Sequence, residues 1–105
     1  MLRIHDVMLG VIRGMRPLLV AIERCDRDLA RQLRASASSV TLNVAEGSGA
    51  FGGTRRERYR SALGSARETL SNLQTAQAFG YVRDLPEDVL AGMQQVIGTL
   101  VRVAR

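Results

Sequence analysis

Residues 4–22 read IHDVMLGVIRGMRPLLVAI, and the apolar side chains of this stretch decide the type of fold. They recur every three or four positions, at Ile4, Val7, Met8, Val11, Met15, Leu18, Leu19 and Ile22. This spacing places apolar side chains on one face of a helix. Pro17 removes one backbone donor, so we expect it to kink that helix. The sequence therefore predicts an amphipathic helix that ends near Cys25.

A second predicted helix begins after Asp26, a residue type that caps helix N-termini, and ends around Gly47. Its expected inward stripe is Leu29, Leu33, Ser36, Val40 and Asn43. Thr54 and Glu57 have the spacing of a capping box, which predicts the start of a third helix. The expected apolar face of this helix is Tyr59, Leu63, Ala66, Leu70, Leu73 and Phe79.

Gly80 is expected to cap the third helix, with Tyr81 and Val82 packing back on its last turn. A fourth helix is predicted from residues 84–87, where acidic side chains favour a helix N-terminus. Its expected core stripe is Val89, Leu90, Met93, Ile97, Leu100 and Ala104. No stretch alternates with the period of a strand. The sequence predicts an all-α fold, an antiparallel up-down four-helix bundle, as a single domain over residues 1–105.

The segment GSGAFGG at residues 47–53 separates the second and third predicted helices. It matches G-x-G-x-x-G, but the strand that a dinucleotide site requires before it is missing. It also lacks the lysine of a phosphate-binding P-loop. We therefore interpret these residues as a flexible connection.

No catalytic or metal-binding constellation is found in the sequence. His5 is the sole histidine and has no Glu-x-x-His partner of the kind that di-iron bundles use. Cys25 is the sole cysteine, so neither a haem motif nor a disulfide framework is expected. The acidic pairs at 26/28 and 87/88 lie at predicted helix starts, where capping explains them. We predict a non-enzymatic protein without a cofactor.

The chain has 105 residues, with 15 basic residues, all of them arginine, and 10 acidic ones. A net charge of +5 and a pI near 10.9 favour contact with nucleic acid or another polyanion. No apolar run approaches the roughly 20 residues of a membrane span. The first residues lack the apolar run of a signal peptide, so a cytoplasmic location is expected.

The arginines are concentrated in two segments. Residues 54–67 carry five arginines and one acid, and residues 1–34 carry seven arginines and four acids. Four of the five, Arg55, Arg56, Arg58 and Arg60, occupy the first two turns of the third predicted helix. There each cation opposes the helix dipole at a cost of about 0.3–1 kcal/mol.

Two stripes of arginine follow from helical spacing. The first is Arg56, Arg60 and Arg67, and the second is Arg27, Arg31 and Arg34. Contact with nucleic-acid phosphates explains them, because guanidinium groups bind phosphate well. The other interpretation is a set of ion pairs with Glu23, Asp28, Glu57 and Glu68. Only Phe51 and Tyr59 are aromatic near the cluster, which favours recognition of the backbone over base stacking.

Two further features concern structure and assembly. Asn43 is expected to hydrogen-bond across the bundle, and Glu46 to hold the loop or an arginine of another helix. Apolar residues remain outside the main stripes: Leu9, Ile12, Val20 and Ala21 in the first helix, and Leu42, Val44 and Phe51 around the second. Surplus apolar surface is typical of an interface, so a homo-oligomer is expected.

The sequence SVTLNVAEGSG at residues 39–49 resembles the S-[IV]-x-x-N-[IV]-A-E-G-x-G motif of a bacterial four-helix-bundle family. That family was first noticed as reading frames in intervening sequences of large-subunit ribosomal RNA genes. Residues 59–68 and 78–82 resemble its later motifs in order and spacing.

This resemblance implies a fold similar to the accessory variability determinant of diversity-generating retroelements. By resemblance the protein would be a homopentameric barrel that binds RNA or DNA and works with a reverse transcriptase. The resemblance implies no enzymatic activity, and it gives Asn43, Glu46 and Gly47 a structural role. The alternative is a protein-interaction or assembly module whose arginines pair with acids of a neighbouring subunit or partner.

Overall fold

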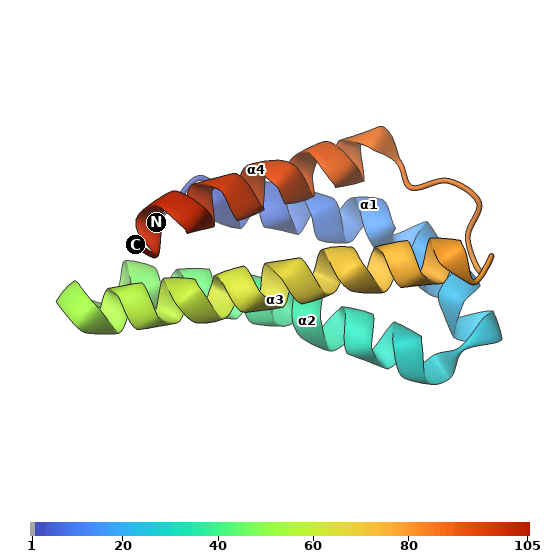
Figure 1. The fold of residues 1–105 in the computed structure, drawn as a ribbon, viewed down its shortest axis with the longest axis horizontal. Coiled ribbons are helices and arrows are strands. Elements are labelled where there is room, and N and C mark those ends of the chain that lie inside the picture. Colours follow the sequence, from blue (N-terminus) through green and yellow to red (C-terminus); the bar gives the residue numbers. More distant parts are fainter. Residues whose placement is uncertain (1) are drawn as a thin grey trace.

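Four helices account for most of the computed structural model, which describes residues 2–105. They are α1 (Ile4–Cys25), α2 (Arg27–Ser48), α3 (Gly52–Ala78) and α4 (Glu87–Val103). Successive helices run in opposite directions, and the two chain ends lie together at one end of an elongated molecule (Figure 1). Both α1 and α3 pack against α2 and α4. The described residues contain no strand, so the all-α four-helix prediction is confirmed.

The junction between α1 and α2 is a single residue, Asp26. Its backbone N–H donates to the carbonyl of Ile22 at 2.7 Å, and its carboxylate accepts from the N–H of Leu29 at 2.9 Å. The residue therefore closes one helix and caps the next, as the sequence predicts. Pro17 lies inside α1, which continues through it as one helix.

The start of α3 differs from the predicted one. The helix begins at Gly52, its N-cap residue Phe51 makes no side-chain capping bond, and Thr54 and Glu57 lie inside the first turns. The capping-box prediction is wrong because Gly52 adopts a φ of +56°, which lets the chain turn into the helix earlier. The connection between α2 and α3 is consequently shorter than the predicted 47–53 loop.

The buried face of α3 is built mainly from small and polar side chains. Its buried residues are Tyr59, Ala62, Ala66, Thr69, Asn72, Leu73 and Ala76. The predicted face members Leu63 and Leu70 are half-buried, and Phe79 is exposed. Small side chains let α2 and α3 approach closely, and Ser36 of α2 satisfies the polar ones. Its Oγ lies 3.0 Å from Thr69 Oγ1 and accepts from Asn72 Nδ2 at 3.3 Å.

Other predicted positions, in α2, in α4 and after α3, agree with the structure in part. Val44, expected among the surplus apolar residues, is fully buried in the core. In α4 the buried stripe includes Val96, while Leu90 and Ile97 are half-buried. Gly80 follows α3 with a φ of +79°, and the Tyr81 N–H donates to the Ala76 carbonyl at 3.0 Å. This is the glycine-terminated helix end that the sequence predicts.

Candidate nucleic-acid interface

One end of the bundle, here called the basic pole, is where α1 and α3 begin and α2 and α4 end (Figure 1). The helix turns at this end carry seven arginines: Arg3, Arg55, Arg56, Arg58, Arg60, Arg102 and Arg105. Their acidic neighbours in the same turns are Asp6, Glu46 and Glu57. The opposite pole, where α2 and α4 begin, has the reverse balance. It carries Arg24, Arg27, Arg31 and Arg83 against Glu23, Asp26, Asp28, Asp84, Glu87 and Asp88.

Two arginines at the start of α3 serve the ends of the neighbouring helices. Arg55 Nε donates to the carbonyls of Ala50 at 2.8 Å and Gly47 at 3.2 Å, at the end of α2. Arg60 Nε donates to the carbonyl of Ala104 at 3.1 Å, just beyond α4. A cation is stabilised at a helix C-terminus. These contacts offset the cost of placing arginines at the positive end of α3.

The N-terminal ends of α1 and α3 at the basic pole lack the side-chain contacts that the C-terminal ends of α2 and α4 have. Neither α1 nor α3 has a side-chain cap on its first N–H groups. The negative ends of α2 and α4 are covered by arginine, while the positive ends of α1 and α3 have no side-chain cap. The helix dipoles and the side-chain charges therefore both make this pole attractive to anions.

The remaining arginines of α3 divide into one paired and two unpaired residues. Arg58 Nη1 lies 2.8 Å from Glu46 Oε2 of α2. Arg56 and Arg67 are exposed and make no hydrogen bond or ion pair with any side chain in residues 2–105. Eleven residues separate them, which is about 16 Å along a helix. Of the predicted α3 cluster, these are the two guanidinium groups that form no hydrogen bond or ion pair within residues 2–105.

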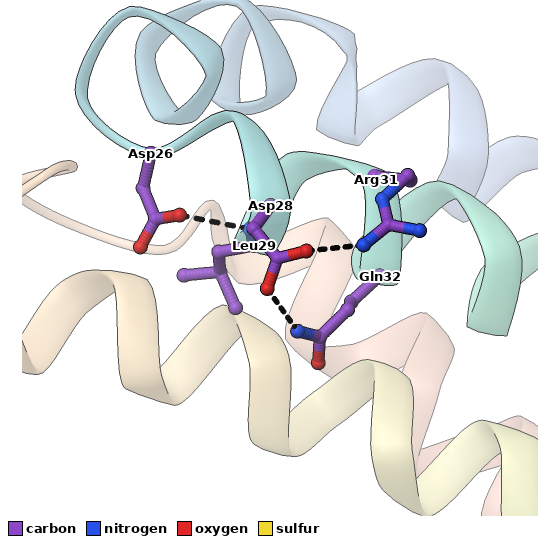
Figure 2. A network of polar contacts seen from close by, with 5 residues as sticks. All are labelled: Asp26, Asp28, Leu29, Arg31 and Gln32. Atoms are coloured by element: carbon purple, nitrogen blue, oxygen red, sulfur yellow. Dashed lines mark hydrogen bonds and ion pairs between the residues drawn. The ribbon is translucent and has the colours of Figure 1, made fainter.

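The second predicted arginine stripe lies away from the basic pole, beginning in the first turn of α2. Asp28 accepts from Arg31 and from Gln32, the latter at 2.8 Å (Figure 2). Arg34 pairs with Glu23 of α1. Arg27 is exposed and has no ion-pair partner in the described chain. Arg31 and Arg34 therefore form the ion pairs of the second interpretation.

These pairs also change the acidity of the carboxyl groups. The hydrogen bond from Arg34 holds the pKa of Glu23 below its usual value. The hydrogen bond from Arg31 does the same to the pKa of Asp28. Both carboxylates therefore stay charged, and their charge offsets the two arginines at neutral pH. Glu57 and Glu68, the other predicted partners, form no ion pair in the described residues.

Comparison with known proteins places this bundle in a family. The family model of the 23S rRNA-intervening sequence protein matches residues 21–101. The chain belongs to that family. The motif resemblance seen in the sequence is thereby confirmed, while the relation to retroelement accessory proteins stays a prediction.

One solved structure is similar to this family member in fold. It is a crystal structure of a protein of unknown function from the S23 ribosomal protein family of Bacteroides thetaiotaomicron. The two chains share 19% identity and superpose with a TM-score of 0.81, covering 97% of this chain and 98% of the other. A comparison with curated proteins finds no match.

The motif residues of this family member lie along the contact between α2 and α3. Asn43 does not bond across the bundle as predicted. Its Nδ2 donates to the backbone oxygen and hydroxyl of Ser39, one turn earlier, at 2.9 and 3.1 Å. The hydroxyl of Ser39 in turn accepts from Ser65 of α3 at 2.8 Å, so the link between helices is made by the serines. The donor group of the Asn43 amide is thus used within its own helix.

Glycine at position 47 is required by a close approach of the two helices. A Cβ atom there would lie 2.5 Å from Cε1 of Tyr59, whose ring packs against the α2 backbone. Tyr59 was predicted from the sequence as a core residue and is 5% exposed. That Tyr59 also lines a pocket is not visible in the sequence, because it depends on where α2 ends beside it.

Two kinds of feature are absent from residues 2–105. No group of three His, Cys, Asp or Glu side chains is close enough to hold a metal ion. None of the helices described there is long and apolar enough to cross a membrane.

Proposed function

We propose that this protein is a non-enzymatic basic bundle that binds the phosphate backbone of RNA or DNA through its basic pole. The observation that carries the proposal is the treatment of the helix ends there. Arg55 and Arg60 cover the carbonyl ends of α2 and α4, and the N-termini of α1 and α3 have no cap. Arg56 adds an unpaired guanidinium to the same surface. Such a surface attracts phosphate without reading bases.

RNA is the first nucleic acid to test. The family is named for intervening sequences of 23S rRNA. Phe51 is the one strongly exposed aromatic residue at the basic pole, since Phe79 lies at the other end and stacks on Tyr81. Extended stacking of single-stranded bases needs several aromatic platforms. Backbone binding, weakly dependent on sequence, is therefore the mode that the side chains favour.

The test is fluorescence anisotropy with labelled RNA and duplex DNA over a range of salt concentrations. Each phosphate contact adds about 0.7–0.9 to the slope of log affinity against log salt. The double variant Arg56→Ala/Arg67→Ala should weaken binding and reduce that slope. Arg31→Ala/Arg34→Ala removes the same charge from paired residues and is the matched control. Absence of binding to RNA and DNA at low salt would reject the proposal.

Assembly into a homo-oligomer, with a pentameric barrel as the favoured form, is a second part of the proposal. Large apolar side chains remain exposed on the single chain: Val20, Leu42, Phe51 and Phe79. An oligomer would cover such residues. The molar mass from light scattering tests this, because a monomer of 11.5 kDa would contradict it.

The same exposed residues favour the alternative function, an assembly module whose arginines pair with a partner's acids. The two functions predict different results for the Arg56→Ala/Arg67→Ala variant. Under the alternative its molar mass falls, and under nucleic-acid binding the mass stays while affinity falls. An accessory role beside a reverse transcriptase or an RNA-processing system, and a cytoplasmic location, belong to the same proposal.

A further inference from the structure

A small pocket opens at the basic pole, between the beginning of α1, the end of α2 and the beginning of α3. It has a volume of about 280 Å³ and is lined by Leu2, Ser48, Arg55 and Tyr59. The pocket is separate from the exposed row of Arg56 and Arg67, because neither of these residues lines it. Its walls come from three segments that the fold brings together.

Tyr59 brings an unused hydroxyl to this pocket. The ring is fixed against Gly47 and is 5% exposed. The hydroxyl makes no hydrogen bond with any residue from 2 to 105, and no fully buried polar side-chain atom in that range lacks a partner. Buried tyrosine hydroxyls normally have a partner. The hydroxyl oxygen is therefore not fully buried, and the residue that carries it lines the pocket.

Arg55 brings a guanidinium group that is already oriented. Its Nε donates to two backbone carbonyls, which fixes the plane of the group. Its two terminal nitrogens make no hydrogen bond within the described residues. The group also lies 5.8 Å from the centre of the Phe51 ring, which is 84% exposed. A fixed guanidinium loses little entropy when it binds a ligand with several oxygens.

The size and charge of the pocket limit what it can hold. Its volume is below the roughly 300–1,000 Å³ of pockets that take whole drug-sized ligands. It therefore suits a single charged group. Guanidinium and hydroxyl donors together match the oxygens of a phosphate.

We propose that the pocket formed by Arg55, Tyr59, Ser48 and Leu2 binds a terminal phosphate monoester at the end of a nucleic-acid strand. This inference rests on the proposed nucleic-acid function and adds a preference for strand ends. A phosphodiester inside a strand binds the exposed arginines, whereas a terminal phosphate enters the pocket.

The experiment compares one RNA oligonucleotide in three forms, with a 5′-phosphate, with a 3′-phosphate, and with hydroxyl groups at both ends. Affinity is measured by anisotropy at fixed ionic strength with wild type, Tyr59→Phe and Tyr81→Phe. Tyr59→Phe keeps the ring against Gly47 and removes only the hydroxyl. Tyr81→Phe is the matched control, because the Tyr81 hydroxyl donates to Asp26 at the opposite pole.

Wild type is expected to bind one phosphorylated form about tenfold more tightly than the hydroxyl form. Tyr59→Phe should lose most of this preference and keep its affinity for the hydroxyl form, while Tyr81→Phe keeps both. Inorganic phosphate should remove the preference, and acetate at equal ionic strength should not. A nucleoside monophosphate that competes as well as the phosphorylated strand would contradict a strand-end site.

Equal affinity for all three forms in wild type would overturn the inference and leave the proposed function standing. A preference that survives in Tyr59→Phe would overturn it as well. Ser48→Asp is a second variant, which places a carboxylate at the pocket wall and is expected to abolish the preference by repulsion. If Tyr59→Phe fails to fold, retention of the preference in Ser48→Asp would overturn the inference.

Discussion

At the basic pole Arg55 and Arg60 donate to carbonyls at the ends of α2 and α4, whereas at the opposite pole Arg31 pairs with the Asp28 carboxylate. Arg34 likewise pairs with Glu23. A carbonyl contact covers a partial negative charge and leaves the full charge of the arginine in place. A carboxylate contact cancels it. Arg55 and Arg60 therefore keep their charge at the basic pole, whereas the charges of Arg31 and Arg34 are neutralised by carboxylates.

The largest expected effect on stability concerns the contact between α2 and α3 at the basic pole, where Gly47 meets Tyr59. Gly47→Ala forces a Cβ to within 2.5 Å of the Tyr59 ring, so we expect the free energy of unfolding to fall by about 1–3 kcal/mol. Gly64→Ala is the matched control, because nothing lies within 4 Å of its Cβ position in the same pair of helices. Chemical denaturation of both variants measures the difference. Equal stability of the two would show that the contact between Gly47 and Tyr59 tolerates the extra methyl group.

A smaller effect is expected when the contact between α3 and the end of α4 is removed. Arg60→Ala deletes the donor to the Ala104 carbonyl and should cost about 1 kcal/mol. Arg67→Ala, on the same helix and without a partner, should change stability by no more than about 0.5 kcal/mol. Thermal unfolding of the two variants gives the comparison. An equal loss in both would mean that Arg60 does not stabilise the α4 end.

The smallest effect is the pH dependence of the opposite pole. Ion pairing lowers the pKa of Glu23 and Asp28 in the folded state. Their contribution to the free energy of unfolding is therefore fully present at pH values above the ordinary carboxyl pKa range, and it is lost as the pH falls through the lowered pKa values. Both pairs are exposed, so the contribution is small. We expect the melting temperature of wild type to drop more between pH 7 and pH 3 than that of Glu23→Gln/Asp28→Asn. Equal drops would show that the pairs do not contribute.

Helix boundaries marked by local chemistry were predictable from the sequence. Asp26 caps α2 with its own carboxylate, and Gly80 ends α3 with a left-handed φ, because both effects act within a few residues. The α3 face was mispredicted because burial there follows close packing, which selected Ala62 and Thr69 over Leu63 and Leu70. Apolar periodicity ranks residues by hydrophobicity and misses a face made of small side chains.

The arginine cluster could be located from the sequence, but the contact partner of each arginine could not. The position of Arg60 beside Ala104 depends on the packing of α3 against α4, across 44 positions of sequence. The pairing of Arg58 with Glu46 depends on how the two helices meet at the short connection. Helical spacing placed Arg56, Arg60 and Arg67 in one stripe. Only the packing of the neighbouring helices shows that Arg60 is hydrogen-bonded, whereas Arg56 and Arg67 are unpaired in the described chain.

The central claim is that location and pairing, rather than total charge, decide which arginines bind nucleic acid. The direct test is the affinity of Arg56→Glu and Arg27→Glu for the same RNA, since both residues are exposed and unpaired in the described chain and the charge change is identical. We predict that Arg56→Glu weakens binding about tenfold or more and that Arg27→Glu changes it less than about twofold. Equal losses in the two variants would contradict the account.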